Sequence, residues 1–141
     1  MTTGRTFLLR NGVVIPMEGA KVAYDPGSVL VVNGIIEAVG PVDEIDLHPA
    51  AMAVDVIEMS GHVIVPGFHN CHLHSGLLRG TAESLALWEW LEKHVDPAHR
   101  ALTPEIAEAA SWMAYTEALR GGTTAVLDMW RFMEGSARAA E

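Results

Sequence analysis

The feature that most constrains the fold is a change in sequence texture near residue 61. Before it, short runs of β-branched residues alternate with Gly, Pro, Asn and Asp, a pattern typical of short strands joined by turns. After it, the segment HVIVPGF at 62–68 is almost continuously apolar, as in a parallel strand that is covered on both sides. Two helical patterns and a second apolar run at 123–129 follow. The order strand, helix, helix, strand predicts a parallel crossover and an α/β fold.

Two helices are expected between these strands. Apolar residues at spacings of three and four predict an amphipathic helix over about 84–94, which Pro97 helps to end. The residues of this stripe, expected in the core, are Leu85, Trp88, Leu91 and Val95. A second helix is expected over 104–120, with Thr103 as its N-cap and Gly121-Gly122 as its exit.

Two Asn-Gly dipeptides predict turns in the first part of the chain. Asn33-Gly34 separates two apolar runs, and its tolerance of positive φ suits a two-residue hairpin. Asn11-Gly12 is interpreted in the same way, as a break between strands at 6–10 and 13–17. Alternating apolar and acidic residues predict a further strand at 53–59. No helix is expected in this part, because helical periodicity is absent.

Composition limits the classes of partner. A hydrophobic content of 50% and a charged content of 19% exclude a disordered chain. The formal net charge is −9 and no basic cluster is present, so no nucleic-acid partner is expected. No apolar run approaches the roughly 20 residues that cross a bilayer, and no secretory signal is recognised, so no membrane association is expected. The single cysteine, Cys71, excludes an internal disulfide, is expected to be a small buried hydrophobe, and favours a cytoplasmic protein.

Two histidines follow the apolar run at the expected carboxyl end of its strand. In an extended chain, residues two apart face the same side, with side chains roughly 6–7 Å apart, so His72 and His74 can converge on one metal ion. The same alternation directs His69, Cys71 and Leu73 to the opposite face. A His-x-His pair often arises by chance as capped or surface residues. Its place beyond a strand end, where parallel α/β folds bind ligands, favours a metal site.

The segment VIVPGFHNCHLH resembles the first barrel strand of the amidohydrolase superfamily, in which Pro-Gly, a short apolar link, and Asn or Asp precede His-x-His. The stretches SGLLRG, LWEWLEKHVDPAHRALTPE and EALRGGTTAVLDM resemble the region from the first barrel loop to the second strand. The resemblance is nearest to the branch of methylthioadenosine/S-adenosylhomocysteine deaminases, other heterocycle aminohydrolases and triazine chlorohydrolases. It implies that residues 1–64 are half of a small β-sandwich and that 65–141 are the first β/α units of an incomplete metal-dependent (β/α)8 barrel.

The resemblance also implies an activity. It implies a hydrolase with one divalent metal ion, Zn²⁺ or Fe²⁺, that cleaves carbon–nitrogen (non-peptide) or carbon–chlorine bonds of a small nitrogen heterocycle. His72 and His74 are the implied first two ligands. The further ligands and the general acid/base are absent from the 141 residues, so the chain is expected to be an amino-terminal part of the enzyme. The alternative is a noncatalytic truncated module that binds a partner or a lone metal ion, and self-association into a homo-oligomer stays open.

Three residues are candidate substrate contacts. His99 stands where nucleoside deaminases of this branch tend to carry a glutamate that binds ribose hydroxyls, which argues against a nucleoside substrate. The loop after the His-x-His pair is also shorter than in those deaminases. Trp90 is a candidate for the pocket lining, and Asp128, after the second strand, for positioning a loop or the substrate. The commoner roles for such residues are core packing for tryptophan and loop capping for aspartate.

Overall fold

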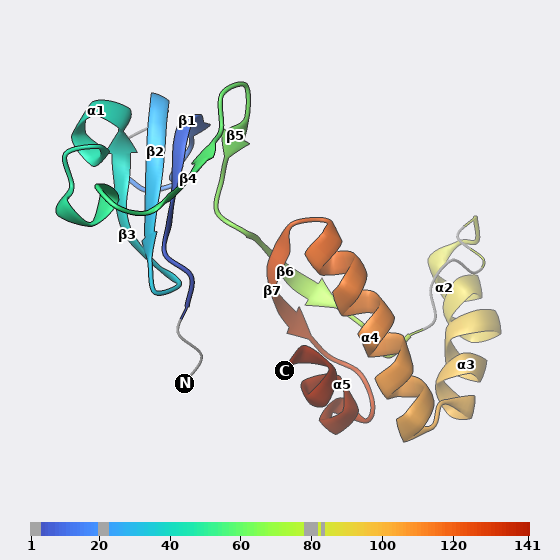
Figure 1. Cartoon of the computed structure of the whole chain (residues 1–141). Coiled ribbons are helices and arrows are strands. Elements are labelled where there is room, and N and C mark those ends of the chain that lie inside the picture. Colours follow the sequence, from blue (N-terminus) through green and yellow to red (C-terminus); the bar gives the residue numbers. More distant parts are fainter. Residues whose placement is uncertain (1–3, 20–22, 78–81, 83) are drawn as a thin grey trace. The chain divides into compact units, whose positions relative to one another are not determined.

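The computed structural model describes residues 4–19, 23–77, 82 and 84–141. The protein is mixed α/β, as expected from the sequence (Figure 1). It divides into two compact units, Met1–Pro66 and Gly67–Glu141, which are described separately. In the described part of the chain, no helix has both the length and the apolar character needed to span a membrane.

The first unit contains a sheet that has five strands in the described residues. They are β1 (Phe7–Val14), β2 (Tyr24–Val32), β3 (Ile35–Pro41), β4 (Asp55–Glu58) and β5 (Val63–Ile64). The neighbours β3, β2 and β1 are antiparallel, whereas β1 pairs in parallel with β4 and then with β5. Asn33 and Gly34, with φ of 52° and 81°, connect β2 to β3. The predicted hairpin is confirmed.

The second Asn-Gly dipeptide does not form a turn. Strand β1 continues through Asn11 and Gly12, and its register with β2 shifts there. Asn11 has a φ of 66°, so the positive φ that the dipeptide tolerates produces a β-bulge instead. The predicted break between strands at 6–10 and 13–17 is therefore wrong. The bulge falls where β1 exchanges its parallel partner β4 for β5.

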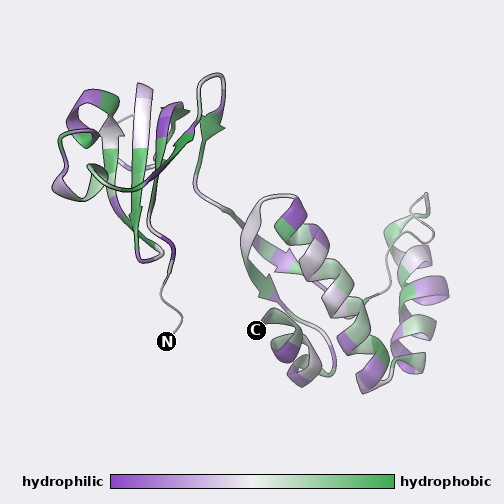
Figure 2. Ribbon diagram, viewed as in Figure 1, coloured by the Kyte–Doolittle hydropathy of each residue, from purple (hydrophilic) through white to green (hydrophobic). Residues whose placement is uncertain are grey.

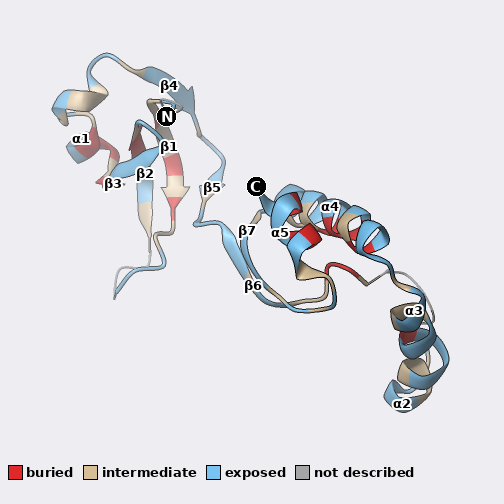
Figure 3. Ribbon diagram, turned by 90° about the horizontal axis from the view of Figure 1, so that it is seen from below, coloured by how far each residue is buried: buried red, intermediate tan, exposed pale blue. Residues whose placement is uncertain are grey.

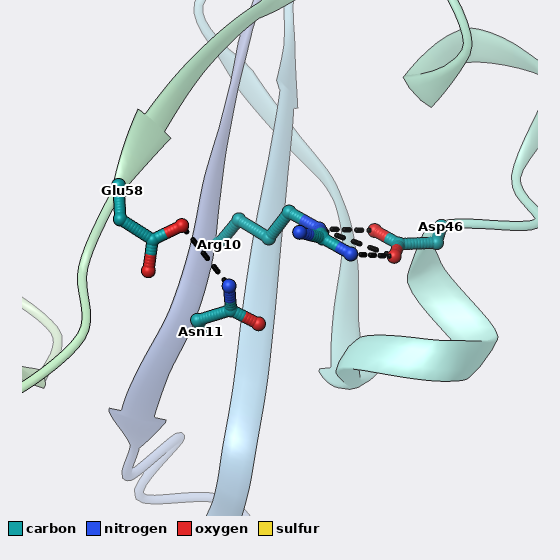
Figure 4. A network of polar contacts seen from close by, with 4 residues as sticks. All are labelled: Arg10, Asn11, Asp46 and Glu58. Atoms are coloured by element: carbon teal, nitrogen blue, oxygen red, sulfur yellow. Dashed lines mark hydrogen bonds and ion pairs between the residues drawn. The ribbon is translucent and has the colours of Figure 1, made fainter.

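Polar side chains support the bulge, as Figure 4 shows. Arg10 donates from Nε and Nη2 to the carboxylate of Asp46, with distances of 2.5 to 3.1 Å. Asn11 Nδ2 donates to Glu58 Oε2 at 3.0 Å. The hydrogen bond and charge of Arg10 hold the pKa of Asp46 below its usual value. These contacts tie β1 to β4 and to the end of a short helix, α1 (Val42–Ile45).

The core of the first unit is aliphatic. Its buried residues form two clusters. One contains Leu8, Leu30 and Ile45, and the other contains Val14, Val29 and Val31. Figure 2 shows that apolar residues dominate much of β2. Helix α1 and the 3-10 helix η1 (Pro49–Ala51) also belong to this unit, so the expectation of no helix is wrong. Both are too short to produce a helical periodicity in the sequence.

The second unit contains two parallel strands, β6 (Phe68–Leu73) and β7 (Thr123–Asp128), in its described residues. The helices are α2 (Leu87–Trp90), η2 (Leu91–Val95), α3 (Asp96–Ala101), α4 (Pro104–Arg120) and α5 (Met133–Ala140). The expected parallel crossover is confirmed. The bounds of α4 are also as predicted, because Thr103 Oγ1 accepts from the N–H of Ile106 and Gly121 follows the last turn.

The apolar run at 62–68 does not form one covered strand. Its first part is β5 in the first unit, and β6 begins only after Pro66-Gly67, since proline has no N–H for the ladder. Phe68 and Leu127 are 55% and 67% exposed, and most of β6 and β7 is accessible within this chain (Figure 3). Cys71 is exposed for the same reason, so its predicted burial is wrong.

Pro97 does not end the first helical segment. The elements α2, η2 and α3 are continuous from Leu87 to Ala101. In the π-helical turn η2, the N–H of Asp96 bonds to the carbonyl of Leu91, and Pro97, which has no N–H, follows this change of register. The extra residue rotates the faces on either side of the turn. Trp88, on α2, is 74% exposed, so its predicted burial is wrong.

Candidate metal centre

His72 and His74 lie together at the carboxyl end of β6. Their Nε2 atoms are 3.1 Å apart, their ring centroids are 4.8 Å apart, and the planes meet at 77°. The convergence predicted from strand alternation is confirmed. His72 is exposed and His74 is half-buried, so the pair is accessible in this chain.

A backbone carbonyl fixes the ring of His74. Its Nδ1 lies 2.6 Å from the carbonyl oxygen of Met129, just beyond β7. Because a carbonyl oxygen only accepts, Nδ1 carries the proton and Nε2 keeps its lone pair. That lone pair faces Nε2 of His72 at 3.1 Å. His74 thus holds the tautomer in which Nε2 can bind a metal ion.

The pair fits a divalent metal ion in chemistry and spacing. Two imidazole nitrogens that each lie about 2.0–2.1 Å from one ion are at most about 4.2 Å apart, so the 3.1 Å separation is compatible with a shared ion. A metal-binding histidine usually donates its other N–H to a carbonyl or carboxylate, as His74 does here. Among the described residues no group of three or more His, Cys, Asp or Glu forms a metal cluster. The described part of the chain therefore brings two candidate ligands together at this strand end.

Trp130 lies between two histidine rings. Its ring centroid is 4.8 Å from that of His74 and 4.7 Å from that of His99, with an interplanar angle of 51° in both pairs. Arg131 Nη1 donates to the carbonyl of His99 at 3.3 Å, which connects α3 to the segment after β7. One aromatic ring therefore separates His99 from His74. Sequence reasoning missed Trp130, although an aromatic residue just beyond the second strand was an available signal.

Trp90 is half-buried in α2. In the described residues no ring contact joins it to His74 or to Trp130. The loop after the His-x-His pair includes residues 78–81 and 83, which lie outside the described residues. The predicted shortness of that loop therefore has no structural counterpart here.

Both carboxylate oxygens of Asp128 accept hydrogen bonds inside the second unit. Oδ1 accepts from the N–H of Ser75 at 3.0 Å, and Oδ2 accepts from the Ser75 hydroxyl and from Tyr115 Oη, the latter at 2.6 Å. Burial would raise the pKa of Asp128, but the bonds from Ser75 and Tyr115 outweigh it and hold this pKa below its usual value. Burial and the same carboxylate raise the pKa of Tyr115. This geometry fits the loop-capping role.

Two further serines extend this cluster. Ser75 Oγ is 2.8 Å from Ser111 Oγ on α4, which is 2.7 Å from Ser136 Oγ on α5. All three serines are 1% exposed or less. Sequence reasoning missed the cluster, because the members are 36 and 25 positions apart and single serines have no recognisable pattern.

Comparison with known proteins identifies the family. Residues 63–141, more than half of the chain, match the model of the Amidohydrolase family. The chain belongs to the amidohydrolase family. The resemblance of its His-x-His segment to that family is confirmed.

The relatives of this amidohydrolase chain include deaminases. It is 38% identical to a 5-methylthioadenosine/S-adenosylhomocysteine deaminase of Syntrophobacter fumaroxidans over 94% of its length. It is 36% identical to a 5'-deoxyadenosine deaminase of Methanosarcina mazei over 95% of its length. The chain spans 30% of the length of each of these curated relatives.

Solved structures are also similar. An adenosine deaminase from Xanthomonas campestris with bound zinc has a TM-score of 0.74 and 30% identity, covering 96% of this chain and 31% of that one. An atrazine chlorohydrolase from Arthrobacter aurescens TC1 complexed with zinc has a TM-score of 0.77, covering 95% of this chain and 33% of that one. Its identity of 21% shows a shared fold alone.

Proposed function

We propose that the chain is the amino-terminal part of a metal-dependent hydrolase that cleaves carbon–nitrogen (non-peptide) or carbon–chlorine bonds of a nitrogen heterocycle. The observation that carries this proposal is the 3.1 Å approach of the His72 and His74 Nε2 atoms at a strand end. Membership of the amidohydrolase family and the deaminase relatives support it. The same support extends to a (β/α)8 barrel begun by the second unit and to a β-sandwich half formed by the first.

We propose that His72 and His74 hold one divalent ion, zinc or iron, with ligands from elsewhere. Zinc is favoured because two similar solved structures contain it. Such an ion, when bound, supplies a nucleophile from water at neutral pH. The chain itself contributes the fixed tautomer of His74, because the Met129 carbonyl keeps the proton on Nδ1.

We propose that the substrate is a small planar heterocycle that lies near the adjacent, mutually tilted rings of His99, Trp130 and His74. Deamination is favoured over dechlorination, because both curated relatives named above are deaminases. The histidine at position 99 is neutral or cationic, unlike a glutamate, and is less suited to bind ribose hydroxyls. Trp90 stays a candidate substrate contact on the same helical segment.

The test is metal analysis and turnover of the full-length gene product with His72→Ala and His74→Ala. His69→Ala is the matched control, because His69 is exposed on the same strand. Wild type and the control should contain zinc or iron and release ammonia or chloride from a panel of amino- and chloro-substituted purines and triazines. Both test variants should lose metal and turnover together. Metal retained in both His72→Ala and His74→Ala would contradict the assigned ligands. A wild type that binds metal but turns over no substrate would favour the noncatalytic module.

A further inference from the structure

We propose that Asp128, with Ser75 and Tyr115, is a positioning device that sets the ring of His74 for metal binding. These three residues are named the Asp128 clamp. The proposal rests on the proposed function, in which His74 is a metal ligand. None of the three residues touches the imidazoles in the described contacts, so their role is to position and not to react.

Hydrogen bonds join the carboxyl ends of β6 and β7 on both sides of His74. Asp128 ends β7, and its carboxylate accepts from the N–H and hydroxyl of Ser75, the residue directly after His74. The next residue, Met129, donates its N–H to the carbonyl of Leu73 at 3.1 Å. The residues on both sides of His74 are therefore bonded to two consecutive residues of the other strand end. This leaves the backbone at His74 little freedom to shift.

The position of the β7 end also determines the hydrogen bond to the His74 ring. The carbonyl that accepts from His74 Nδ1 is that of Met129, the residue directly after Asp128. A shift of the β7 end relative to Ser75 therefore displaces the acceptor that selects the His74 tautomer. A displacement of about 1 Å would lengthen the 2.6 Å contact beyond the range of a good hydrogen bond.

The hydrogen bonds of Asp128 and Ser75 also connect them to helix α4. An ionised carboxylate only accepts, so the single proton of the Ser75 hydroxyl goes to Asp128. The Ser111 hydroxyl lies 2.8 Å from that of Ser75 and donates to the Ala107 carbonyl on its own helix at 2.9 Å. Tyr115 on α4 donates to the same carboxylate at 2.6 Å. Helix α4 therefore contacts both Ser75 and Asp128, through Ser111 and Tyr115, and the two serines are buried.

A first experiment tests the positioning without metal. Long-range proton–nitrogen spectra of the metal-free full-length protein, at a pH of about 8 where imidazoles are neutral, report the tautomer of His74. The wild type should show the proton on Nδ1. Asp128→Asn should shift His74 toward a mixture with the Nε2–H form, and Ser75→Ala should shift it less, because it keeps its backbone N–H. Glu108→Gln, which alters a carboxylate contact between α4 and α5, is the matched control and should resemble wild type.

A second experiment measures the affinity for Zn²⁺ alone by competition with a chromophoric chelator. Asp128→Asn should weaken it about 10- to 100-fold, as is usual for residues that orient a ligand, whereas Glu108→Gln should change it less than about twofold. If Asp128→Asn does not fold, Tyr115→Phe and Ser75→Ala should both weaken binding by smaller factors.

The outcomes separate the two proposals. An unchanged tautomer together with unchanged Zn²⁺ affinity in Asp128→Asn and Ser75→Ala would overturn the clamp. A wild type that does not bind Zn²⁺ but whose His74 tautomer changes in Asp128→Asn would overturn the proposed function and support the ring positioning.

Discussion

The two units bury different kinds of side chain. The first unit buries branched aliphatic residues on its sheet and against the short helices α1 and η1, with Leu30 fully inaccessible. In the second unit, the buried residues of α4 and α5 are small, and they are Ala107, Ala110, Ser111, Ala114, Gly135, Ser136 and Ala139. Figure 3 shows this burial where the two helices meet, while β6 and β7 are largely exposed.

This difference indicates that the two units are stabilised in different ways. Apolar burial, worth roughly 25 cal/mol per Å², stabilises the first unit. The second relies more on close helix contact and on the hydrogen bonds of the Asp128 clamp. Gly135 illustrates this contact, since a Cβ there would lie 2.9 Å from the Cβ of Glu108. The candidate metal centre therefore belongs to the unit in which three buried serines were found.

The largest expected effect tests the aliphatic core. Leu30→Ala should destabilise the first unit by about 2–5 kcal/mol, because a fully buried side chain leaves a cavity. Phe68→Ala in the second unit removes a larger side chain that is 55% exposed, and should cost much less. Urea unfolding of both variants measures the two free energies. An equal loss would show that the strands of the second unit are as well packed as those of the first.

The second effect tests the polar cluster. Asp128→Ala removes the acceptor of Ser75 and Tyr115, and should cost about 1–3 kcal/mol, the penalty of unsatisfied buried groups. Glu108→Ala, which breaks an ion pair with Arg138 at the surface, should cost less. Thermal unfolding of the two variants is the measurement. A larger loss in Glu108→Ala would place the main polar support at the surface instead.

The third effect is a pH dependence. The folded pKa of Asp128 is depressed, so its ionised form favours the fold. This stabilisation is complete above the unfolded aspartate pKa of about 3.9 and is lost as the pH falls through the lower folded pKa. Asp128→Asn should remove this contribution of the ionised carboxylate. The free energy of unfolding of the wild type should therefore exceed that of the variant by less and less as the pH falls from about 6 to about 3. A difference that stays constant with pH would be inconsistent with an ionised clamp.

The smallest effect concerns Arg10 in the first unit. Arg10→Gln removes the ion pair with Asp46, which is accessible to solvent, so only a slight loss of stability is expected. Salt near 1 M should reduce the loss further by screening. Unfolding at low and high salt checks both statements. A loss comparable to that of Leu30→Ala would mean that the bulge, and not the aliphatic core, governs the first unit.

Local signals made several elements predictable from sequence. Helix α4 could be bounded, because Thr103 caps its start and Gly121 follows its end. The β2–β3 hairpin could be placed, because Asn33-Gly34 favours positive φ. The convergence of His72 and His74 followed from strand alternation, which depends on backbone geometry alone.

Features that depend on partners distant in the chain could not be predicted. Asn11-Gly12 has the same local preference as Asn33-Gly34, but it forms a bulge at the place where β1 exchanges β4 for β5. The π-helical turn at Leu91–Val95 had no sequence pattern that indicated it. The clamp joins Ser75 to Asp128 across 53 positions, so neither residue alone indicated it.

The most direct test of the metal centre is anomalous diffraction at the zinc absorption edge from crystals of the full-length protein grown with Zn²⁺. One peak is expected about 2.0–2.1 Å from the Nε2 atoms of both His72 and His74. A peak bound elsewhere, or the absence of any peak near these two rings, would contradict it.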